Sequence, residues 1–165
     1  PCERWASGAH FIMSVSPFAG CFLESNTMIE YTIEGTPRPQ GSKRHVGGGI
    51  MVESSKHIKE WRAFARLKAT IAMQRHERIV KPNAIRLTVA FGFDRPKKHS
   101  TSKGLRANAP LYHTSTPDTD KLLRALLDSM SGVVFEDDSQ VSVIDARKYY
   151  LKAAQTSVRV DVVSE

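Results

Sequence analysis

The stretch of residues 116–140 constrains the chain most, because it joins an acidic entrance, a helix-like segment and a second acidic cluster. Residues 114–138 hold six acidic and two basic side chains, a net charge of −4. The whole chain carries +7, so everything outside this window sums to +11. An acidic cluster inside a basic chain is typical of a divalent-metal site that acts on a polyanion.

The middle of this stretch is predicted to be a helix. A single apolar stripe at helical spacing consists of Leu123, Leu126, Leu127 and Met130. A separate polar stripe at intervals of four consists of Asp120, Arg124 and Asp128. Pro117 disfavours helix at the residue before it, Asp118 can serve as the N-cap, and Gly132 ends the element.

Helical spacing limits which carboxylates can share a metal ion. Asp118 and Asp120 both lie at the helix entrance. Asp128 follows Asp120 by eight residues, which is about 12 Å along the axis and too far for a shared ion. A third ligand must return from elsewhere, and Asp137 or Asp138 is the best candidate. The alternative is that Asp118 only caps the helix and the later pair only marks a turn.

Two short motifs now indicate a family. The first is Pro-Asp-x-Asp-x-Leu-x-[Lys/Arg]-x-x-x-Asp from Pro117, and after Gly132 comes Asp-Asp-x-Gln-Val, ending at Val141. Their order and separation resemble the RusA-type Holliday junction resolvases, which cut four-way DNA junctions. The similarity extends loosely from Met28 to the C-terminus. This resemblance implies a Mg²⁺-dependent homodimer with two active sites, in which Mn²⁺ substitutes for Mg²⁺.

The resemblance also assigns roles to individual residues. By position, the family's catalytic, metal-binding aspartates fall on Asp118, Asp120 and Asp138. Its essential lysine falls on Arg124, and its usual asparagine after the second aspartate is Lys121 here. Because arginine stays protonated in proteins, only a charge role remains for Arg124. Supporting roles are expected for Asp128, Asp137 and Lys148.

Three basic segments are expected to contact DNA phosphate. They are a loop broken by proline and glycine at residues 35–44, a helix at 55–75, and a long loop at 95–115 that leads into Asp118. The candidate contacts are Arg38, Lys43, Arg44, Arg62, Arg66, Lys97, Lys98, Lys103, Arg106 and Lys121. Each segment could instead be an ordinary solvated surface, and the last a disordered loop. The glycines at 47–49 lack the Gly-Lys-Ser/Thr ending of a phosphate loop.

Alternating apolar residues predict strands at 29–33, 84–93, 140–150 and 156–163. The helix at 55–75 should bury the positions that follow its period, namely Ile58, Trp61, Ala65, Leu67, Lys68 and Ala72. Together these elements predict an α/β (α+β) chain, a single compact domain with a mixed sheet and two main helices. Residues 28–165 would form the RusA-like endonuclease domain, and residues 1–27 a poorly ordered extension.

Composition excludes several classes of protein. The sequence has 41% hydrophobic and 25% charged residues and a pI of about 9.6, which fits a soluble globular protein that binds a polyanion. Cys2 and Cys21 form no C-x-x-C pair, so a zinc site is not expected. No apolar run is long enough to span a membrane. We also expect a cytoplasmic protein, bacterial or phage-encoded.

Three functions fit this sequence. The first is resolution of four-way junctions by symmetric paired nicks in recombination and repair. The second is a metal-dependent nuclease that uses the same residues on flaps or other branched DNA. The third is a DNA-binding module without catalysis, which would keep the basic surface but would not need the aspartates.

Overall fold

The computed structural model describes residues 28–41, 43–45, 51–53, 57–102 and 104–163. The expected N-terminal extension at 1–27, the glycines at 47–49 and Lys103 lie outside these residues. The predictions made for them therefore stay predictions.

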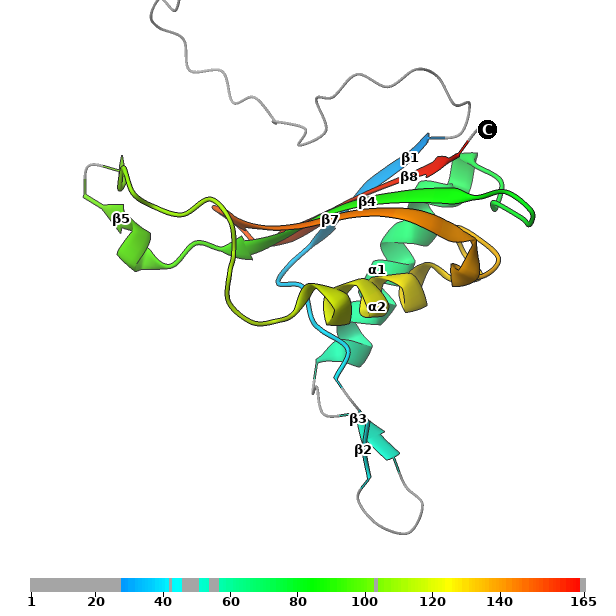
Figure 1. Cartoon of the computed structure of the whole chain (residues 1–165), viewed down its shortest axis with the longest axis horizontal. Coiled ribbons are helices and arrows are strands. Elements are labelled where there is room, and N and C mark those ends of the chain that lie inside the picture. Colours follow the sequence, from blue (N-terminus) through cyan, green and yellow to red (C-terminus); the bar gives the residue numbers. More distant parts are fainter. Residues whose placement is uncertain (1–27, 42, 46–50, 54–56, 103, 164–165) are drawn as a thin grey trace, which may run out of the picture.

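The centre of the fold is a four-stranded mixed sheet with the order β1-β8-β4-β7 (Figure 1). Its strands are β1 Met28–Glu34, β4 Ile85–Asp94, β7 Val141–Leu151 and β8 Gln155–Val162. Strand β8 runs antiparallel to both of its neighbours, and β4 runs parallel to β7. The four alternating segments of the sequence are thus confirmed as strands, and β7 lies at an edge of the sheet.

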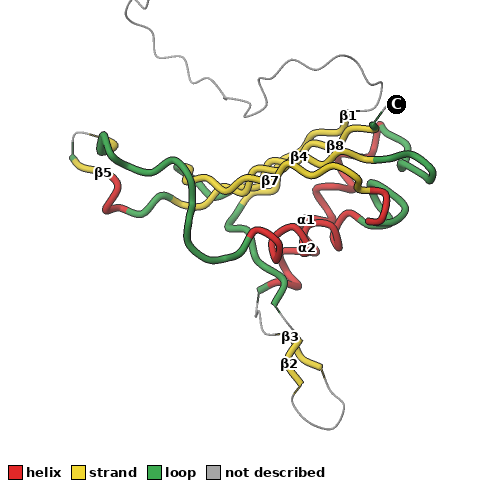
Figure 2. Tube along the Cα trace, in the orientation of Figure 1, coloured by secondary structure: helices red, strands yellow, loops and turns green. Residues whose placement is uncertain are grey.

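Two helices, α1 Ile58–Ala72 and α2 Thr119–Met130, pack on one face of this sheet (Figures 1 and 2). A short 3-10 turn, η1 Met73–Arg75, extends α1. Every second residue of β4 from Ile85 to Phe93 is buried, because successive side chains of a strand point to opposite faces. Neither helix covers the other face of the sheet. The predicted α+β domain with two main helices is confirmed.

The buried stripes of the helices differ in part from the predicted ones. In α2 the buried residues are Leu122, Ala125, Leu126, Ser129 and Met130. The predicted members Leu123 and Leu127 are only partly buried, because α2 faces both the sheet and α1 and its buried arc is shifted by one residue. In α1 the predicted positions Ile58, Trp61 and Ala65 are buried, whereas Leu67 is 53% exposed and Ala69, which the sequence pattern did not select, faces the core.

Two basic segments that we expected to be loops contain paired strands. Strand β2 Lys43–His45 pairs with β3 Met51–Glu53 in an arm that projects away from the sheet (Figure 1). Segment 95–115 holds the turn η2 Lys97–His99 and the strands β5 Ser100–Thr101 and β6 Gly104–Leu105, which also pair. Backbone pairing, which needs no hydrophobic period, explains why the sequence pattern missed both.

Segment 95–115 is fixed to the end of the sheet by aromatic rings. The His113 ring stacks on Phe93 with centroids 4.1 Å apart, and it lies 4.9 Å from the Tyr150 ring. The His99 ring contacts Tyr150 edge-on at 5.0 Å. The long loop is therefore anchored to the last residues of two strands, β4 and β7.

This anchor predicts a pH dependence of stability. Burial, and secondly the nearby Lys148 ammonium, lower the pKa of His113 below its ordinary 6.5. The folded state thus favours neutral His113, so its contribution is complete above about pH 6.5 and is lost as the pH falls. We expect the thermal midpoint of the wild type to drop more than that of His113→Phe between about pH 7.5 and about pH 5.5. Exposed His76→Gln is the control, and an equal drop in wild type and His113→Phe would refute the prediction.

Candidate active site

Helix α2 begins as the sequence predicts, with Asp118 at its N-cap position. The Asp118 side chain makes no capping hydrogen bond, however, and its Oδ2 accepts a hydrogen bond from Lys121 Nζ at 2.5 Å. This contact lowers the pKa of the Asp118 carboxyl and raises the pKa of Lys121. Asp118 is thus an exposed, ionised carboxylate and does not act only as a cap. The helix ends before Gly132, whose φ of 75° suits a residue without Cβ.

Lys148 fixes the chain that enters α2. Its Nζ donates hydrogen bonds to the carbonyl oxygens of Ser115 and Pro117, both at 2.8 Å. The ammonium is therefore bound to backbone one residue before Asp118. This contact links β7 to the helix entrance, and the supporting role of Lys148 in the reaction stays a prediction.

The polar stripe of α2 faces solvent, with Asp120, Arg124 and Asp128 all exposed. No hydrogen bond or ion pair joins Arg124 to another residue in the described ranges. Asp128 instead accepts a hydrogen bond from Arg62 of α1 at 2.9 Å. A ladder of ion pairs from Asp120 through Arg124 to Asp128 is therefore not formed, and Arg124 points its charge outward.

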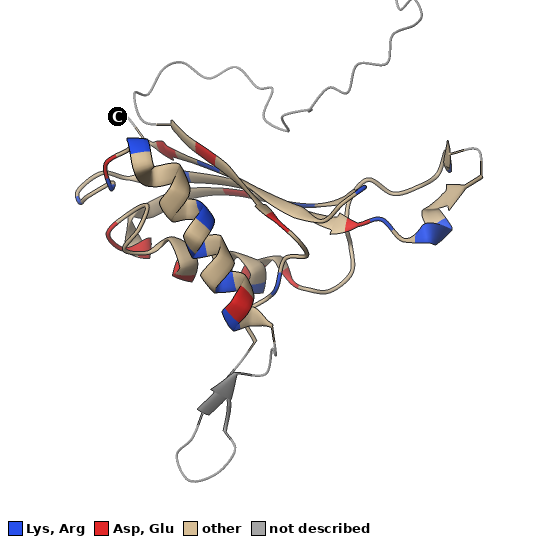
Figure 3. Ribbon diagram, turned by 180° about the vertical axis from the view of Figure 1, so that it is seen from behind, with Lys and Arg blue, Asp and Glu red and all other residues tan. Residues whose placement is uncertain are grey.

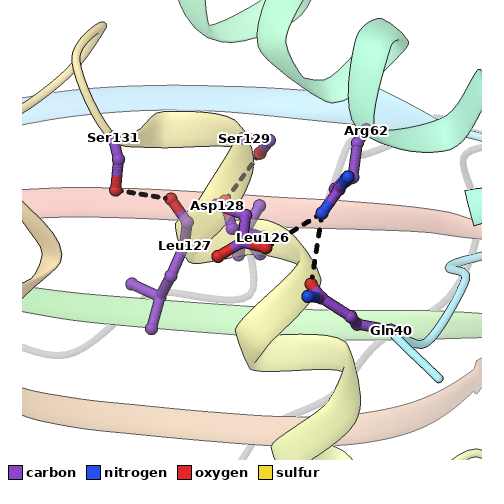
Figure 4. Close-up of polar contacts among 7 residues, drawn as sticks. All are labelled: Gln40, Arg62, Leu126, Leu127, Asp128, Ser129 and Ser131. Atoms are coloured by element: carbon purple, nitrogen blue, oxygen red, sulfur yellow. Dashed lines mark hydrogen bonds and ion pairs between the residues drawn. The ribbon is translucent and has the colours of Figure 1, made fainter. Parts of the chain in front are cut away.

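Arg62 joins three segments, as Figure 4 shows. The same NH1 that binds Asp128 lies 3.4 Å from the side-chain oxygen of Gln40, and the Gln40 backbone N–H donates to the Lys121 carbonyl at 3.0 Å. Sequence reasoning missed Gln40, and nothing in the local pattern around it indicated these long-range contacts.

The second acidic cluster forms a capped turn, η3 Asp138–Gln140. Asp137 accepts a hydrogen bond from the Ser139 N–H at 3.0 Å, which lowers the pKa of its carboxyl. The side-chain oxygen of Gln140 accepts hydrogen bonds from the N–H groups of Glu136 and Asp137. Asp137 therefore shapes the turn, and Asp138 is exposed on it.

Asp138 faces an open groove of about 650 Å³ between α1 and the end of α2. The groove is lined by Lys59, Arg62, Ala63, Arg66, Asp128, Ser129, Ser131, Asp137 and Asp138. Arg66 also donates to the Ser131 carbonyl at 3.2 Å. The sequence prediction missed Lys59, although it precedes Arg62 by three residues and so lies on the same helical face.

The model of the family described as endodeoxyribonuclease RusA matches residues 31–161. The chain belongs to the RusA endodeoxyribonuclease family. A relative, the uncharacterised protein YqaN of Bacillus subtilis strain 168, is 26% identical over 143 residues, which cover 82% of this chain and 97% of that protein. The family resemblance carried by the two short motifs is thus confirmed. None of the helices in the described ranges is long and apolar enough to cross a membrane.

The three aspartates that the RusA motif selects do not meet within one chain. Asp118 and Asp120 lie at the first turn of α2, whereas Asp138 lies beside its last turn. The helix has 12 residues and is therefore about 18 Å long. Among the described residues, no three His, Cys, Asp or Glu side chains form a group that could hold a metal ion. A metal site shared by all three stays a prediction.

The basic residues expected to contact DNA are distributed over several elements of this RusA-family chain. Figure 3 shows Lys and Arg recurring along α1, with acidic residues on the neighbouring α2 and on the turn after it. Lys43 and Arg44 lie in β2, and Lys121 is paired with Asp118. The exposed candidates are Arg38, Arg66, Lys97, Lys98 and Arg106. These positions are compatible with phosphate contacts but do not by themselves establish them.

The contact between Arg62 and Asp128 yields a second prediction. Both side chains are about a third exposed, so their coupling energy should stay below about 1 kcal/mol. A double-mutant cycle with Arg62→Ala and Asp128→Ala, measured by urea unfolding, tests this value. If Arg62 contacts DNA, Arg62→Ala should weaken DNA binding while Asp128→Ala does not. Glu60→Ala, exposed on the same helix, is the control, and equal weakening by both alanine variants would contradict a phosphate contact.

Proposed function

We propose that this member of the RusA family is a Mg²⁺-dependent endonuclease that resolves four-way DNA junctions by symmetric paired nicks in recombination and repair. The observation that supports this most is the exposed acidic entrance of α2, with two carboxylates there and the outward charge of Arg124 one turn after Asp120. Basic segments precede it in the chain and lie on α1. Carboxylates that face solvent between basic elements suit the hydrolysis of a phosphodiester.

The donor chemistry at this entrance fits Mg²⁺. Asp118 and Asp120 offer carboxylate oxygens, and Mg²⁺ is usually held by one or two carboxylates together with waters and substrate phosphate. When bound, the ion would lower the pKa of a water molecule and neutralise charge on the phosphate. In the absence of the ion, the hydrogen bond from Lys121 lowers the pKa of Asp118. We expect Mn²⁺ to substitute for Mg²⁺.

We propose a homodimer with two-fold symmetry, because a four-way junction presents two equivalent strands. Asp118 and Asp138 lie at opposite ends of α2, so the dimer could also complete the metal site. Asp138 of one copy is too far from Asp118 of the same copy to share an ion, but a second copy could bring its Asp138 to that entrance. The residue predicted by the motif would then act across the interface.

The decisive test uses three substrates. The protein is incubated with Mg²⁺ and, in separate reactions, a four-way junction, a flap or a linear duplex that shares their sequence. We expect paired symmetric nicks with 5′-phosphate and 3′-hydroxyl ends in the junction alone. Cutting of flaps without junctions would make the chain a different branched-DNA nuclease, and binding without cutting would make it a DNA-binding module. Either result overturns the proposal.

Affinity for the junction should fall steeply with salt. The +11 outside the acidic window would meet DNA phosphates, and each phosphate neutralised contributes about −0.9 to the slope of log K against log salt on duplex DNA. Fluorescence anisotropy over a salt series without Mg²⁺ measures this slope. A slope near zero would show that the chain does not bind DNA through its phosphates.

A further inference from the structure

Two tyrosines stack on the surface at the edge of the sheet. The rings of Tyr112 and Tyr149 lie 5.2 Å apart with an angle of 29° between their planes. Tyr112 is 55% exposed, so one face of its ring covers Tyr149 while the rest meets solvent. Large aromatic surface is normally buried in a core or an interface, and this pair belongs to neither among the described residues.

The exposed ring is held firmly. Tyr112 forms an antiparallel bridge with Tyr149, the His113 N–H donates to the Lys148 carbonyl at 3.0 Å, and the Tyr150 N–H donates to the Leu111 carbonyl at 2.9 Å. On the helix-covered side, the stacking of His113 on Phe93 anchors the same segment. A ring with a fixed orientation loses little conformational entropy when a ligand binds to it.

Basic residues come from the two segments that carry this pair. Segment 95–115 contains five Lys and Arg residues and no Asp or Glu. Arg95 fixes the segment to the sheet by donating to the carbonyls of Pro110 at 2.7 Å and Tyr150 at 3.1 Å. The Arg147 guanidinium lies beside the pair, because it is hydrogen-bonded to Tyr149 and pairs with Asp145 at 2.8 Å, and both contacts raise its pKa. Aromatic rings among cations are the usual surface for unpaired nucleic acid.

The position of the pair relative to the active-site helix indicates which part of the DNA it meets. Lys148, next to Tyr149 on β7, contacts the chain that enters α2. Because side chains alternate along a strand, Lys148 lies on the helix-covered face and Tyr149 on the other face. The edge strand β7 thus separates the carboxylates of α2 from the tyrosines. Two DNA strands that diverge at a branch point could therefore pass on opposite sides of β7.

We propose that Tyr112, backed by Tyr149, is a stacking platform for an unpaired nucleobase at the branch point of DNA. The proposal rests on the proposed function, because the branch point is where the strands diverge and where a base can leave its pair when the junction is opened. The base contributes its ring face, so no sequence preference is expected. Arg147 and the basic side chains of segment 95–115 would hold the phosphates that flank this base.

The test uses Tyr112→Leu, which keeps apolar packing on Tyr149 but removes the ring, and Tyr112→Phe, which keeps the ring. Leu111→Ala is the matched control, since Leu111 is equally exposed at 57% and has no aromatic face. Binding of a thymidine oligonucleotide, a four-way junction and a blunt duplex is measured by fluorescence anisotropy without Mg²⁺. Thermal midpoints verify that each variant is folded.

We expect Tyr112→Leu to bind the oligonucleotide and the junction about tenfold more weakly, with duplex binding unchanged. Tyr112→Phe and Leu111→Ala should match the wild type. In a parallel experiment, 5-iododeoxyuridine at the branch point should cross-link to Tyr112 on irradiation. The platform is overturned if Tyr112→Leu binds like the wild type, if Leu111→Ala or duplex binding falls equally, or if no cross-link maps to Tyr112.

Failure of the platform and failure of the proposed function are separable. Binding and cross-linking need neither metal nor cleavage. If the protein cross-links through Tyr112 but cuts no junction, the platform is supported and the proposed function is refuted. If Tyr112→Leu binds like the wild type and nicks junctions normally, the platform is refuted and the proposed function is supported.

Discussion

Replacing Asp118, Asp120 or Asp138 by asparagine is expected to reduce junction cleavage by about a hundredfold or more while junction binding persists. Loss of one metal-ligand charge removes several kcal/mol of stabilisation from the transition state, which gives this magnitude. The three carboxylates are exposed, so the substitutions should not unfold the chain. Binding could even tighten, since each change removes repulsion of phosphate.

Cleavage and binding of the same labelled junction measure both effects. Glu77→Gln, an exposed acidic residue outside the acidic window, is the control for charge alone. Asp128→Asn and Asp137→Asn should show milder losses, because Asp128 pairs with Arg62 and Asp137 caps the η3 turn. Cutting near the wild-type rate by any of the three main variants would remove that aspartate from the active site.

A mixture of two inactive variants tests whether Asp138 acts across the dimer. In a mixed dimer of Asp118→Asn and Asp138→Asn chains, a shared arrangement leaves one complete site, formed by the intact Asp118 of one copy and the intact Asp138 of the other. We then expect single nicks to reappear on mixing. If each chain builds its site alone, every site in the mixture is damaged and no activity returns.

The fold was predictable where side-chain periodicity is local. Alternation in β4 and the turn at Gly132 predicted a buried strand and a helix end correctly, because burial and backbone geometry act there over a few residues. Leu67 was misplaced because Ala69, two residues later, takes the position that faces the core, and only the packing of α1 decides this. The anchoring of His113 on Phe93 depends on residues 20 positions apart, beyond any local pattern.

The sequence names candidate site residues but does not fix their geometry. The motif places Asp118 before Asp138 along the chain, and this order contains no distance. The structure places them at opposite ends of α2. Lys121, which stands where the family usually has asparagine, is explained by its ion pair with Asp118.

Arg124 provides the last prediction, because the family usually has a lysine there. Arg124→Gln should slow cleavage at least about tenfold with folding unchanged, and Arg124→Lys should restore most of the rate. An arginine cannot give up its proton in a protein, so Arg124 can act only as a fixed positive charge beside the phosphate. The side chain is exposed one turn after Asp120 and faces outward from the same helix.

The structure already weakens the competing account of Arg124 as a rung in a surface ladder, since Asp128 pairs with Arg62 instead. A ladder would contribute only about 0.2–0.5 kcal/mol per pair and would show in stability rather than in rate. Single-turnover cleavage and urea unfolding of both variants therefore separate the two roles, with Arg75→Gln as the control for loss of one exposed guanidinium. A normal rate with slightly lower stability in Arg124→Gln would leave only a structural role, whereas a slow rate rescued by lysine requires the positive charge itself at the phosphate.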